Sequence, residues 1–474
     1  MALGGEGTTP GGAGTAATDG GADATNTDGR ATSADADGRA DTVRADAAGA
    51  AHRSGAPRKT GASERTATAM PVRASDTARL LGVDAARGLA VLGMFAAHLG
   101  PHPRDGGAGE AMWMFHGFPS ALFALLAGLS LALLTGGANP VRGAARRTAA
   151  LRILLRALLL FPLGLLLAAL GTNVLVILCY YAIYFVLALP MLWLRPLVVA
   201  SCAGVLAVGG PLLSFVIRGA VEPMQGPFEY TRFSLADGDG LLALFVSGTY
   251  PALTWLPFVL AGVVLGRLRL RRLRAAAWTA VAGGAAVLLG YGGSWLVSTR
   301  FGARQRLHEL LAGGLAPTPI GSGASDSVEA VAALDERIRW GMLGTVPTTD
   351  PAWLSIASPH SGTPFDVVGA TGVALLVLAA CLFLVRAGVV RSVLSPIIAV
   401  GSMPLTIYSG HLVGLAMLGS VPPELDFPVL ISFIVGAGAF AMVWHRFVGR
   451  GPLEQGLHSF AHRVAPGEPL KHPG

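Results

Sequence analysis

The stretch "LLGVDAARGLAVLGMFAAHLG", Leu80 to Gly100, has the length and apolar character of a helix that crosses a lipid bilayer. It nevertheless carries Asp84 and Arg87 near one end and His98 near the other. At about 100° per residue these three side chains share one face of a helix, and the helical rise separates Asp84 from His98 by about 21 Å. Ionisable residues inside a membrane are costly and tend to face the bundle interior or a cavity. The stretch therefore predicts a membrane helix with one polar face.

The composition of the whole chain points the same way. Of its 474 residues 52% are hydrophobic and 13% are charged, and the mean hydropathy is +0.57, which is more apolar than a soluble domain. We therefore predict an all-α, polytopic integral membrane helix bundle. About ten transmembrane helices are expected, at residues 82–100, 115–136, 153–171, 174–194, 197–217, 241–266, 275–297, 364–386, 394–418 and 427–445.

Basic residues follow every second span. "VRGAARRTAALRILLR", Arg195, "GRLRLRRLR", "RAGVVR" and "HRFVGRG" stand after the even-numbered spans, whereas the other connections are acidic, mixed or short. Positive residues concentrate in cytoplasmic loops, so both termini are expected in the cytoplasm of a multi-pass cell-membrane protein. The same rule accounts for the net charge of +7 without a nucleic-acid partner.

The chain divides into three regions. Residues 1–78 are rich in Gly, Ala, Thr and Asp, and they predict a disordered low-complexity cytoplasmic tail. Residues 79–450 form the transmembrane domain, and 451–474 are expected to be a second cytoplasmic tail. Within the domain, residues 298–363 form a long external loop. Two of its stretches, "RQRLHELLAGG" and "SVEAVAALDERIRW", have helical periodicity and favour a small cap.

Asp84 and Arg87 admit two interpretations. They stand three residues apart, so they fit an ion pair at the membrane interface, with Arg87 snorkelling toward lipid headgroups. Alternatively, the pair lies inside the bundle and helps to hold an anionic cofactor, because the Arg guanidinium suits phosphate geometry.

Four histidines are expected on the external side, namely His98, His116, His360 and His411. Each alone is more often a structural residue, but four on one face favour chemistry. Histidine transfers protons near neutrality and can carry an acyl group. No two of these four histidines stand at HxxxH or HExxH spacing on one helix, and Cys179, Cys202 and Cys381 stand far from them in the sequence, so we predict neither a metal site nor a disulfide.

Aromatic and proline residues add further expectations. Tyr180 and Tyr181 offer hydroxyl groups to an interior cavity or simply pack in the core. Trp113 fits an interfacial belt or a contact with the cap. Pro251 and Pro404 are expected to kink or break their spans, which is tolerated where neighbours satisfy the freed backbone groups.

Three segments together resemble a known family. "GVDAARGLAVLGMFAAH", then "WMFHG", then "SALFALLAGLSLALL" are similar to the heparan-alpha-glucosaminide N-acetyltransferase catalytic-domain family and its bacterial polytopic relatives of unknown function. The resemblance covers about residues 80–447. It implies that Asp84, Arg87 and Gly88 form the D-x-x-R-G element, that Trp113 and Phe115 are the aromatic cluster, and that His116 is catalytic.

The resemblance also implies a reaction, in which acetyl-CoA approaches from the cytosolic side and an amino sugar receives the acetyl group on the other side. In this hypothesis Asp84 and Arg87 bind the donor, while His116, His98 and His411 handle the proton or the acyl group. The residues expected to contact the acceptor are His360, Tyr180, Tyr181 and Trp113.

Two other functions remain open. One is a transporter or flippase for an amphipathic metabolite or lipid-linked sugar, with the histidines as a proton relay. The other is a non-catalytic membrane scaffold. The sequence leaves a homodimer open in all three cases.

Overall fold

The secondary structure is helical throughout the part of the chain that the structure describes. A computed structural model describes residues 80–102, 107–172, 174–221, 240–312, 327–419, 422 and 425–466. No strand occurs among these residues, which confirms the all-α prediction. The predicted disordered tail, residues 1–78, lies outside the described residues.

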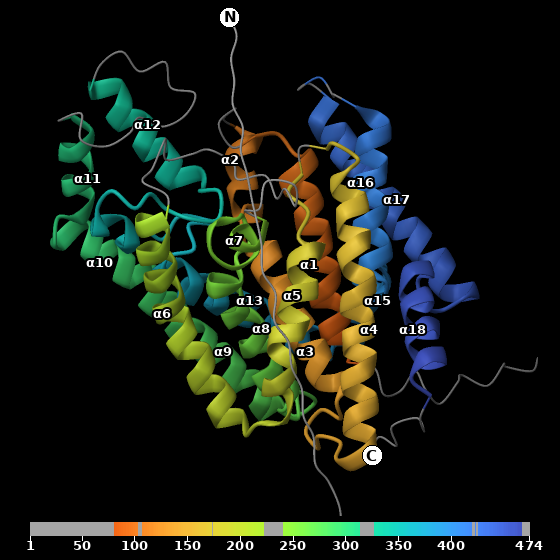
Figure 1. Ribbon diagram of the computed structural model, residues 1–474. Helices are drawn as coiled ribbons and strands as arrows, with labels where there is room; N and C mark the ends of the chain where they lie inside the picture. The colour runs from red at the N-terminus through yellow and green to blue at the C-terminus, as the bar shows by residue number, and fades with distance from the viewer. Residues whose placement is uncertain are drawn as a thin grey trace, which may run out of the picture. The chain divides into compact units, whose positions relative to one another are not determined.

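The first half of the bundle runs from the opening helix to the first broken span (Figure 1). Its helices are α1 (Leu81–Leu99), α2 (Ala108–Met112), η3 (Trp113–Phe115), α3 (Phe118–Leu134), α4 (Gly143–Ala168), α5 (Leu178–Ala188), η4 (Leu189–Trp193), α6 (Pro196–Val221), α7 (Gly240–Leu242), η5 (Ala243–Ser247) and α8 (Ala252–Gly266).

The second half contains the cap and the last spans. Its helices are α9 (Leu273–Val287), η6 (Leu288–Gly292), α10 (Gly293–Arg300), α11 (Ala303–Ala312), α12 (Ser327–Trp340), η7 (Pro351–Ser355), α13 (Pro364–Leu384), α14 (Gly388–Val393), α15 (Ser395–Ser402), α16 (Pro404–Leu418), α17 (Asp426–Phe447) and α18 (Pro452–Val464).

The described helices identify a multi-pass membrane protein, but the expected count of ten spans is not confirmed. Six helices are long and apolar enough to cross a bilayer, and two bent pairs raise the number to eight. The two remaining expected spans correspond to α1 and to the shorter apolar segment Leu178–Trp193. Asp84, Arg87 and His98 lower the hydropathy of α1, and Leu178–Trp193 is shorter than the roughly 20 residues that a perpendicular span needs.

Two spans break where proline removes a backbone donor. Gly240–Ser247 and Ala252–Gly266 meet at an angle of 58° beside Pro251, and Ser395–Ser402 and Pro404–Leu418 meet at 90°. Proline cannot donate the hydrogen bond that would continue a helix, so the chain turns at these positions. The second break places the beginning of α16 across the end of α15, and this direction change positions His411.

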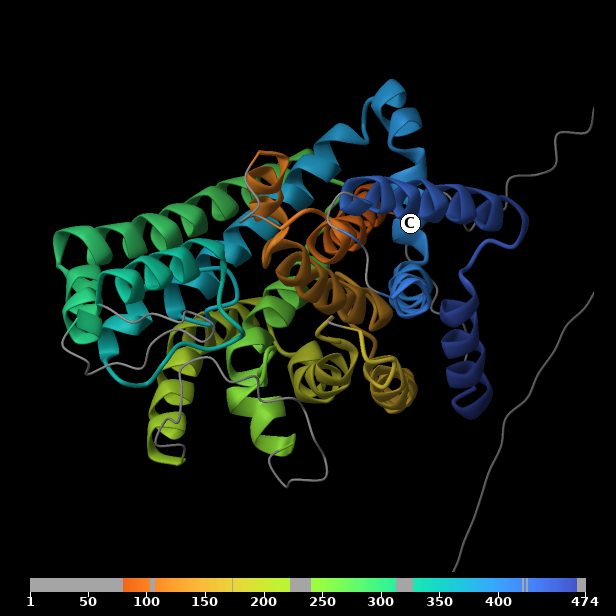
Figure 2. The same ribbon diagram turned by 90° about the horizontal axis from the view of Figure 1, so that it is seen from above.

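Close helix approach depends on glycine, as the pair α3 and α8 shows. A Cβ atom at Gly128 would overlap the carbonyl oxygen of Val259, and one at Gly262 would overlap that of Leu125. Small residues let membrane helices pack backbone against backbone. α1 lies inside the bundle, where it contacts α3, α13, α15, α16 and α17, as the view from above illustrates (Figure 2).

The expected external loop contains two helices at the stretches with helical periodicity. α11 and α12 are joined by Asp335, whose Oδ1 lies 2.8 Å from Arg304 Nη2 and 2.8 Å from His308 Nε2. A small apolar cluster that includes Leu307, Leu334 and Trp353 lies beneath them. The segment is therefore folded rather than a simple connection.

The expected C-terminal tail, residues 451–474, differs from the prediction. It contains α18, which docks on two other helices. Glu454 Oε1 accepts hydrogen bonds from the backbone N–H groups of Leu405 at 2.7 Å and Thr406 at 3.1 Å. The carboxylate thus caps the first turn of α16, where free N–H groups and the helix dipole favour an anion. α18 is therefore packed against the bundle and is not a loose tail.

Candidate functional site

The ends of α1, α4 and α16 and the beginning of α17 meet around one cleft, at what we call the histidine end of the bundle. The cleft has a volume of about 610 Å³ and is lined by His98, Gly171, Thr172, Leu415 and Asp426, among others. This volume is within the range of small-molecule sites. The hydroxyl of Thr172, one of the lining residues, is buried and has no hydrogen-bond partner among the described residues.

His98 and His411 form a pair at the wall of this cleft. Nδ1 of His98 lies 3.1 Å from Nε2 of His411, and the two rings are stacked with an interplanar angle of 9°. One nitrogen must carry the proton and the other must accept it, so the contact holds a single shared proton. His411 is 2% exposed, and its Nδ1 has no partner among the described residues.

Helix geometry and aromatic packing fix this pair. His98 lies in the last turn of α1, and His411 lies two turns beyond the break at Pro404. The His411 ring packs against Phe95 at 4.6 Å and Tyr408 at 5.2 Å between ring centroids. These contacts restrict the imidazole to one orientation, as proton transfer between two fixed rings requires.

His116 and His360 lie in a second group at the same end. His116 precedes the turn at Gly117, whose φ is +85°, and a Cβ atom on Gly117 would lie 3.5 Å from the His360 ring. Nδ1 of His116 lies 3.1 Å from the carbonyl oxygen of Met112. His98 is close enough to His116 and His360 for their charges to interact. The structure thus brings together all four predicted histidines.

His360 has an unusual backbone and an unsatisfied ring. Its φ is +57°, in the left-handed region that few residues other than Gly adopt, although Asn, Asp and His are the most frequent exceptions. Such positions often occur at functional sites. Its ring packs against Tyr250 and Trp255, and its Nδ1 has no partner among the described residues. Burial, then the nearby His116, lowers the pKa of His360 to about 4. The ring is therefore neutral at pH 7.

Asp366 was missed by the sequence reasoning. It lies in the first turn of α13, is 6% exposed, and accepts a hydrogen bond from the Gly362 N–H at 3.1 Å. With His360 it lines a narrow pocket that has room for about one water. A carboxylate in an apolar span was a usable signal, but the T-x-x-D pattern of Thr363 and Asp366 also reads as an ordinary helix cap.

Tyrosine rings connect the two histidine groups through the core. Tyr408 packs on His411, Phe123 stacks on both Tyr408 and Tyr181, and the Tyr181 hydroxyl is buried without a partner among the described residues. Tyr180 packs edge to face on Tyr250 at 5.6 Å. Both predicted tyrosines are therefore buried, and Tyr181 offers the free hydroxyl.

Trp113 and a fifth histidine lie at the surface of this end. The Trp113 indole donates to the carbonyl oxygen of Arg339 in α12 at 2.8 Å, so it makes the cap contact that was one of its two predicted roles. His102 lies 6.2 Å from His116 between ring centroids. The sequence reasoning did not single out His102.

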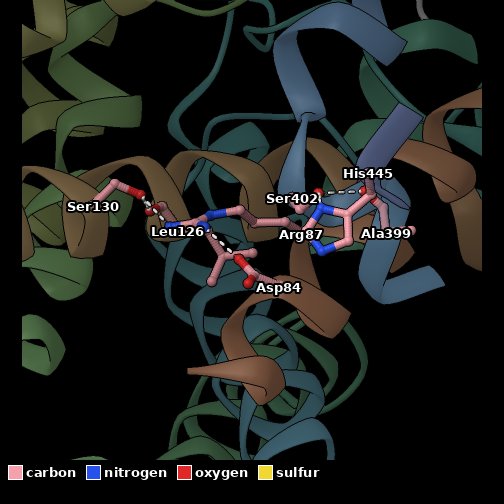
Figure 3. Close-up of polar contacts among 7 residues, drawn as sticks. All are labelled: Asp84, Arg87, Leu126, Ser130, Ala399, Ser402 and His445. Carbon is pink, nitrogen blue, oxygen red and sulfur yellow. Dashed lines mark hydrogen bonds and ion pairs between the residues drawn. The ribbon is translucent and has the colours of Figure 1, made fainter. Parts of the chain in front are cut away.

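Asp84 and Arg87 lie inside the bundle, toward the other end of α1. Arg87 Nη1 donates to Asp84 Oδ1 at 2.8 Å and Nη2 donates to the Ser130 hydroxyl at 2.7 Å (Figure 3). Asp84 is 5% exposed. The pair links α1 to α3, and beside it a Cβ atom on Gly401 would overlap the Asp84 carbonyl oxygen. The ion pair of the first interpretation and the interior position of the second are both present, and binding of an anionic cofactor stays a prediction.

A separate polar contact is drawn in the same view. The Ser402 hydroxyl donates to the Ala399 carbonyl oxygen at 2.7 Å and lies 3.5 Å from Nδ1 of His445 (Figure 3). These groups belong to α15 and α17.

The arrangement provides proton-transfer groups at one end of α1 and a charged pair near the other. No cluster of three or more metal-ligating side chains occurs among the residues with described positions. No model of a known protein family matches the chain, and no curated protein matches it. The resemblance to N-acetyltransferases therefore stays a prediction.

Proposed function

We propose that the protein is a membrane-embedded acyltransferase that moves an acetyl or longer acyl group from cytoplasmic acyl-CoA to an extracytoplasmic amino sugar or envelope glycan. The observation that carries this proposal is the His98–His411 pair at 3.1 Å on the wall of a 610 Å³ cleft. A histidine with a fixed partner can remove the proton of an attacking amine or hydroxyl, which accelerates such reactions about 10²- to 10⁴-fold.

His116 supplies the second function of the site, either as a base or as the carrier of the acyl group. It is partly exposed and lies beside His360 and the pocket that Asp366 lines. In the carrier route, the His116 nitrogen attacks the thioester carbonyl, and the C–S bond breaks as coenzyme A leaves as the thiol. The acceptor amine then attacks the acyl-imidazole, and the C–N bond to His116 breaks. The amine proton passes through the His98–His411 pair to the departing His116 nitrogen and replaces the proton that left with the thiol.

The proposed orientation places the basic connections and both termini in the cytoplasm of the cell membrane, with the histidine end outside. Asp84 and Arg87 act from the cytoplasmic half. Because Arg87 already binds Asp84 and Ser130, we propose that the pair shapes the donor path and presents its remaining N–H groups, rather than serving as a free phosphate clamp.

Donor binding tests this function. Purified protein is titrated with acetyl-CoA while its thermal unfolding is followed, in wild type, Arg87→Ala and His116→Ala. Saturable stabilisation that is lost in Arg87→Ala and kept in His116→Ala supports a donor site separate from the outer chemistry. If acetyl-CoA and longer acyl-CoAs stabilise none of the three proteins, the acyltransferase proposal fails.

A transporter is the second candidate, and the two broken spans favour it. Discontinuous helices often form the substrate and ion sites of secondary transporters, and the break beside Pro404 leads directly to His411. This function predicts proton-dependent movement of an unmodified substrate across a vesicle membrane, whereas the acyltransferase predicts a modified product.

A further inference from the structure

The residues that lead to His116 form a short turn, and its contacts decide how that histidine is oriented. This segment, which we call the His116 turn, covers residues 112–116 and includes η3. The backbone N–H of His116 donates to the carbonyl oxygen of Trp113 at 3.0 Å, which closes the turn. His116 is partly exposed. The direction of its imidazole therefore depends on how the turn is held.

The ring of His116 is fixed by a carbonyl group of the same turn. Nδ1 of His116 lies 3.1 Å from the carbonyl oxygen of Met112. A carbonyl oxygen can only accept a hydrogen bond, so Nδ1 carries the proton that joins the two atoms. In the neutral ring the other nitrogen, Nε2, is then unprotonated and presents its lone pair. The contact with Met112 therefore selects one of the two tautomers.

Apolar side chains attach one side of the His116 turn to α1. Met112 and Phe115 pack against an apolar cluster that includes Phe95 and Leu99 of α1. A Cβ atom on Gly93 would lie 3.4 Å from the Phe115 ring, so this part of α1 approaches the turn closely. These contacts hold the inner side of the turn and leave its outer side to another element.

Trp113 attaches the outer side of the turn to the cap. Its indole N–H donates to the carbonyl oxygen of Arg339, near the end of α12, at 2.8 Å. Its ring packs edge to face on Phe118, in the first turn of α3, with 5.7 Å between the ring centroids. One side chain therefore joins the cap and α3 to the turn that carries His116.

The same part of the cap also holds the loop that carries His360. The backbone N–H of Met342 donates to the carbonyl oxygen of Pro359 at 2.8 Å, and that of Gly344 donates to the carbonyl oxygen of His360 at 2.7 Å. Residues 339–344 therefore bind two histidine-bearing segments that stand far apart in the sequence.

We propose that Trp113 is a positioning residue, which holds the His116 turn against the cap so that Nε2 of His116 faces the substrates. This inference rests on the proposed function, in which His116 acts as a base or as the acyl carrier. In the base route, the acceptor nitrogen forms a bond to the acyl carbon and the C–S bond of acyl-CoA breaks. The proton moves from the acceptor to Nε2 and then to the sulfur of coenzyme A, while Nδ1 keeps its own proton. The carrier route begins at the same lone pair.

Kinetics distinguish this role from the contact with the acceptor that the family resemblance implies for Trp113. Loss of a contact with bound acceptor raises KM, whereas loss of an interaction needed only in the transition state lowers kcat. Trp113→Phe keeps an aromatic ring and removes the indole N–H. With acetyl-CoA and glucosamine, kcat should fall by about ten- to a hundredfold, because small displacements of a catalytic group are costly. The KM for glucosamine should not change.

Trp444→Phe is the matched control. The Trp444 indole also donates to an arginine carbonyl oxygen, that of Arg450, at 2.8 Å, but it belongs to α17 and does not contact the His116 turn. Its loss removes the same kind of hydrogen bond, so kcat and KM should stay at the wild-type values. An equal fall of kcat in both variants overturns the proposal.

The tautomer of His116 is measured without any turnover. Full-length protein labelled with ¹⁵N-histidine is examined in lipid by solid-state NMR at a pH about two units above the ordinary histidine pKa of about 6.5. The signals that His116→Gln removes belong to His116. In wild type and Trp444→Phe, Nδ1 should be protonated and Nε2 unprotonated, whereas Trp113→Phe should show both tautomers. A wild-type His116 with its proton on Nε2 overturns the proposal.

The remaining outcomes separate this inference from the proposed function. Unchanged kcat and an unchanged tautomer in Trp113→Phe overturn the positioning role, as does a raised KM for glucosamine with unchanged kcat. If none of the proteins transfers an acyl group but the tautomers follow the expected pattern, positioning by Trp113 is supported and the acyltransferase fails. If Trp113→Phe does not fold, 3-benzothienylalanine, which has the shape of tryptophan without its N–H, replaces Trp113 with the same expected results.

Discussion

Nδ1 of His98 lies 3.1 Å from Nε2 of His411, although 313 residues separate them in the chain. Two imidazole nitrogens at this distance form one hydrogen bond, in which one ring donates the proton and the other accepts it. His98 lines the cleft and His411 is buried. In the proposed function the His98 ring therefore faces the ligand, and the His411 ring stores or supplies the proton.

Substitution of this pair is expected to show one shared function. His98→Gln and His411→Gln are each expected to reduce the rate of acyl transfer by about 10²- to 10⁴-fold. The double variant should be no slower than the less active single variant, because the effects of residues that act as a unit are not additive. Initial rates with labelled acetyl-CoA measure this. His308→Gln, in the cap, is the control. Additive losses would contradict a shared proton.

The stability of the protein is expected to fall in acid because of His360. Its pKa is lowered from 6.5 to about 4, so the unfolded chain binds a proton that the folded protein excludes. The stabilisation is fully present above pH 6.5 and is lost as the pH falls toward 4. Thermal unfolding of His360→Asn between these values should show a smaller decline than wild type, since Asn also tolerates a positive φ. If the stability of His360→Asn and of wild type declines equally between these pH values, His360 is not the cause. A substitution of the exposed His445 is the control.

Gly401→Ala is expected to destabilise the bundle where α15 crosses α1. The added methyl group would overlap the Asp84 carbonyl oxygen, whereas Gly410→Ala on α16 meets no neighbouring atom. Overpacking of this kind costs about 1–3 kcal/mol. The midpoint of thermal unfolding in detergent should drop for Gly401→Ala and stay near wild type for Gly410→Ala. Equal midpoints for the two variants would refute the close approach.

Glu454→Gln is expected to release α18 from the bundle. The carboxylate accepts two backbone N–H groups of α16 and the Thr406 hydroxyl at 2.5 Å, and loss of a helix cap costs about 0.5–2 kcal/mol. Hydrogen exchange of residues 452–464 should accelerate in this variant. Gln455→Ala, on the exposed face of the same helix, is the control and should leave the exchange rates unchanged. If Glu454→Gln also leaves them unchanged, the cap does not hold α18.

The helical class was predictable from the sequence because apolar length is a local signal. The four histidines could be singled out because ionisable residues in or beside apolar stretches are also a local signal. The pairing of His98 with His411 was not predictable in the same way. It depends on the 90° break at Pro404 and on the packing of α16 against α1, and neither is encoded in the periodicity of a single segment.

Two other misses have physical reasons. In the sequence Asp366 has the spacing of an ordinary helix cap. Only its burial and its position in the pocket with His360 indicate that it belongs to the candidate site. α18 was predicted as a tail because its 13 residues are short and partly polar. Glu454 of α18 binds the first turn of α16, and Arg152 of α4 donates to Ala465 at the end of α18. Contacts with helices far away in the chain therefore decide its structure.

Acyl transfer across a membrane is tested most directly with the protein reconstituted in liposomes. Labelled acetyl-CoA is supplied outside, glucosamine is enclosed inside, and inward-facing and outward-facing molecules are both present. Acetylated glucosamine should accumulate in the lumen with wild type and fall by at least about 10²-fold with His411→Gln. Equal product with both proteins, or no acylated sugar with any acyl-CoA, would contradict the proposed reaction, and movement of unmodified sugar would favour the transporter.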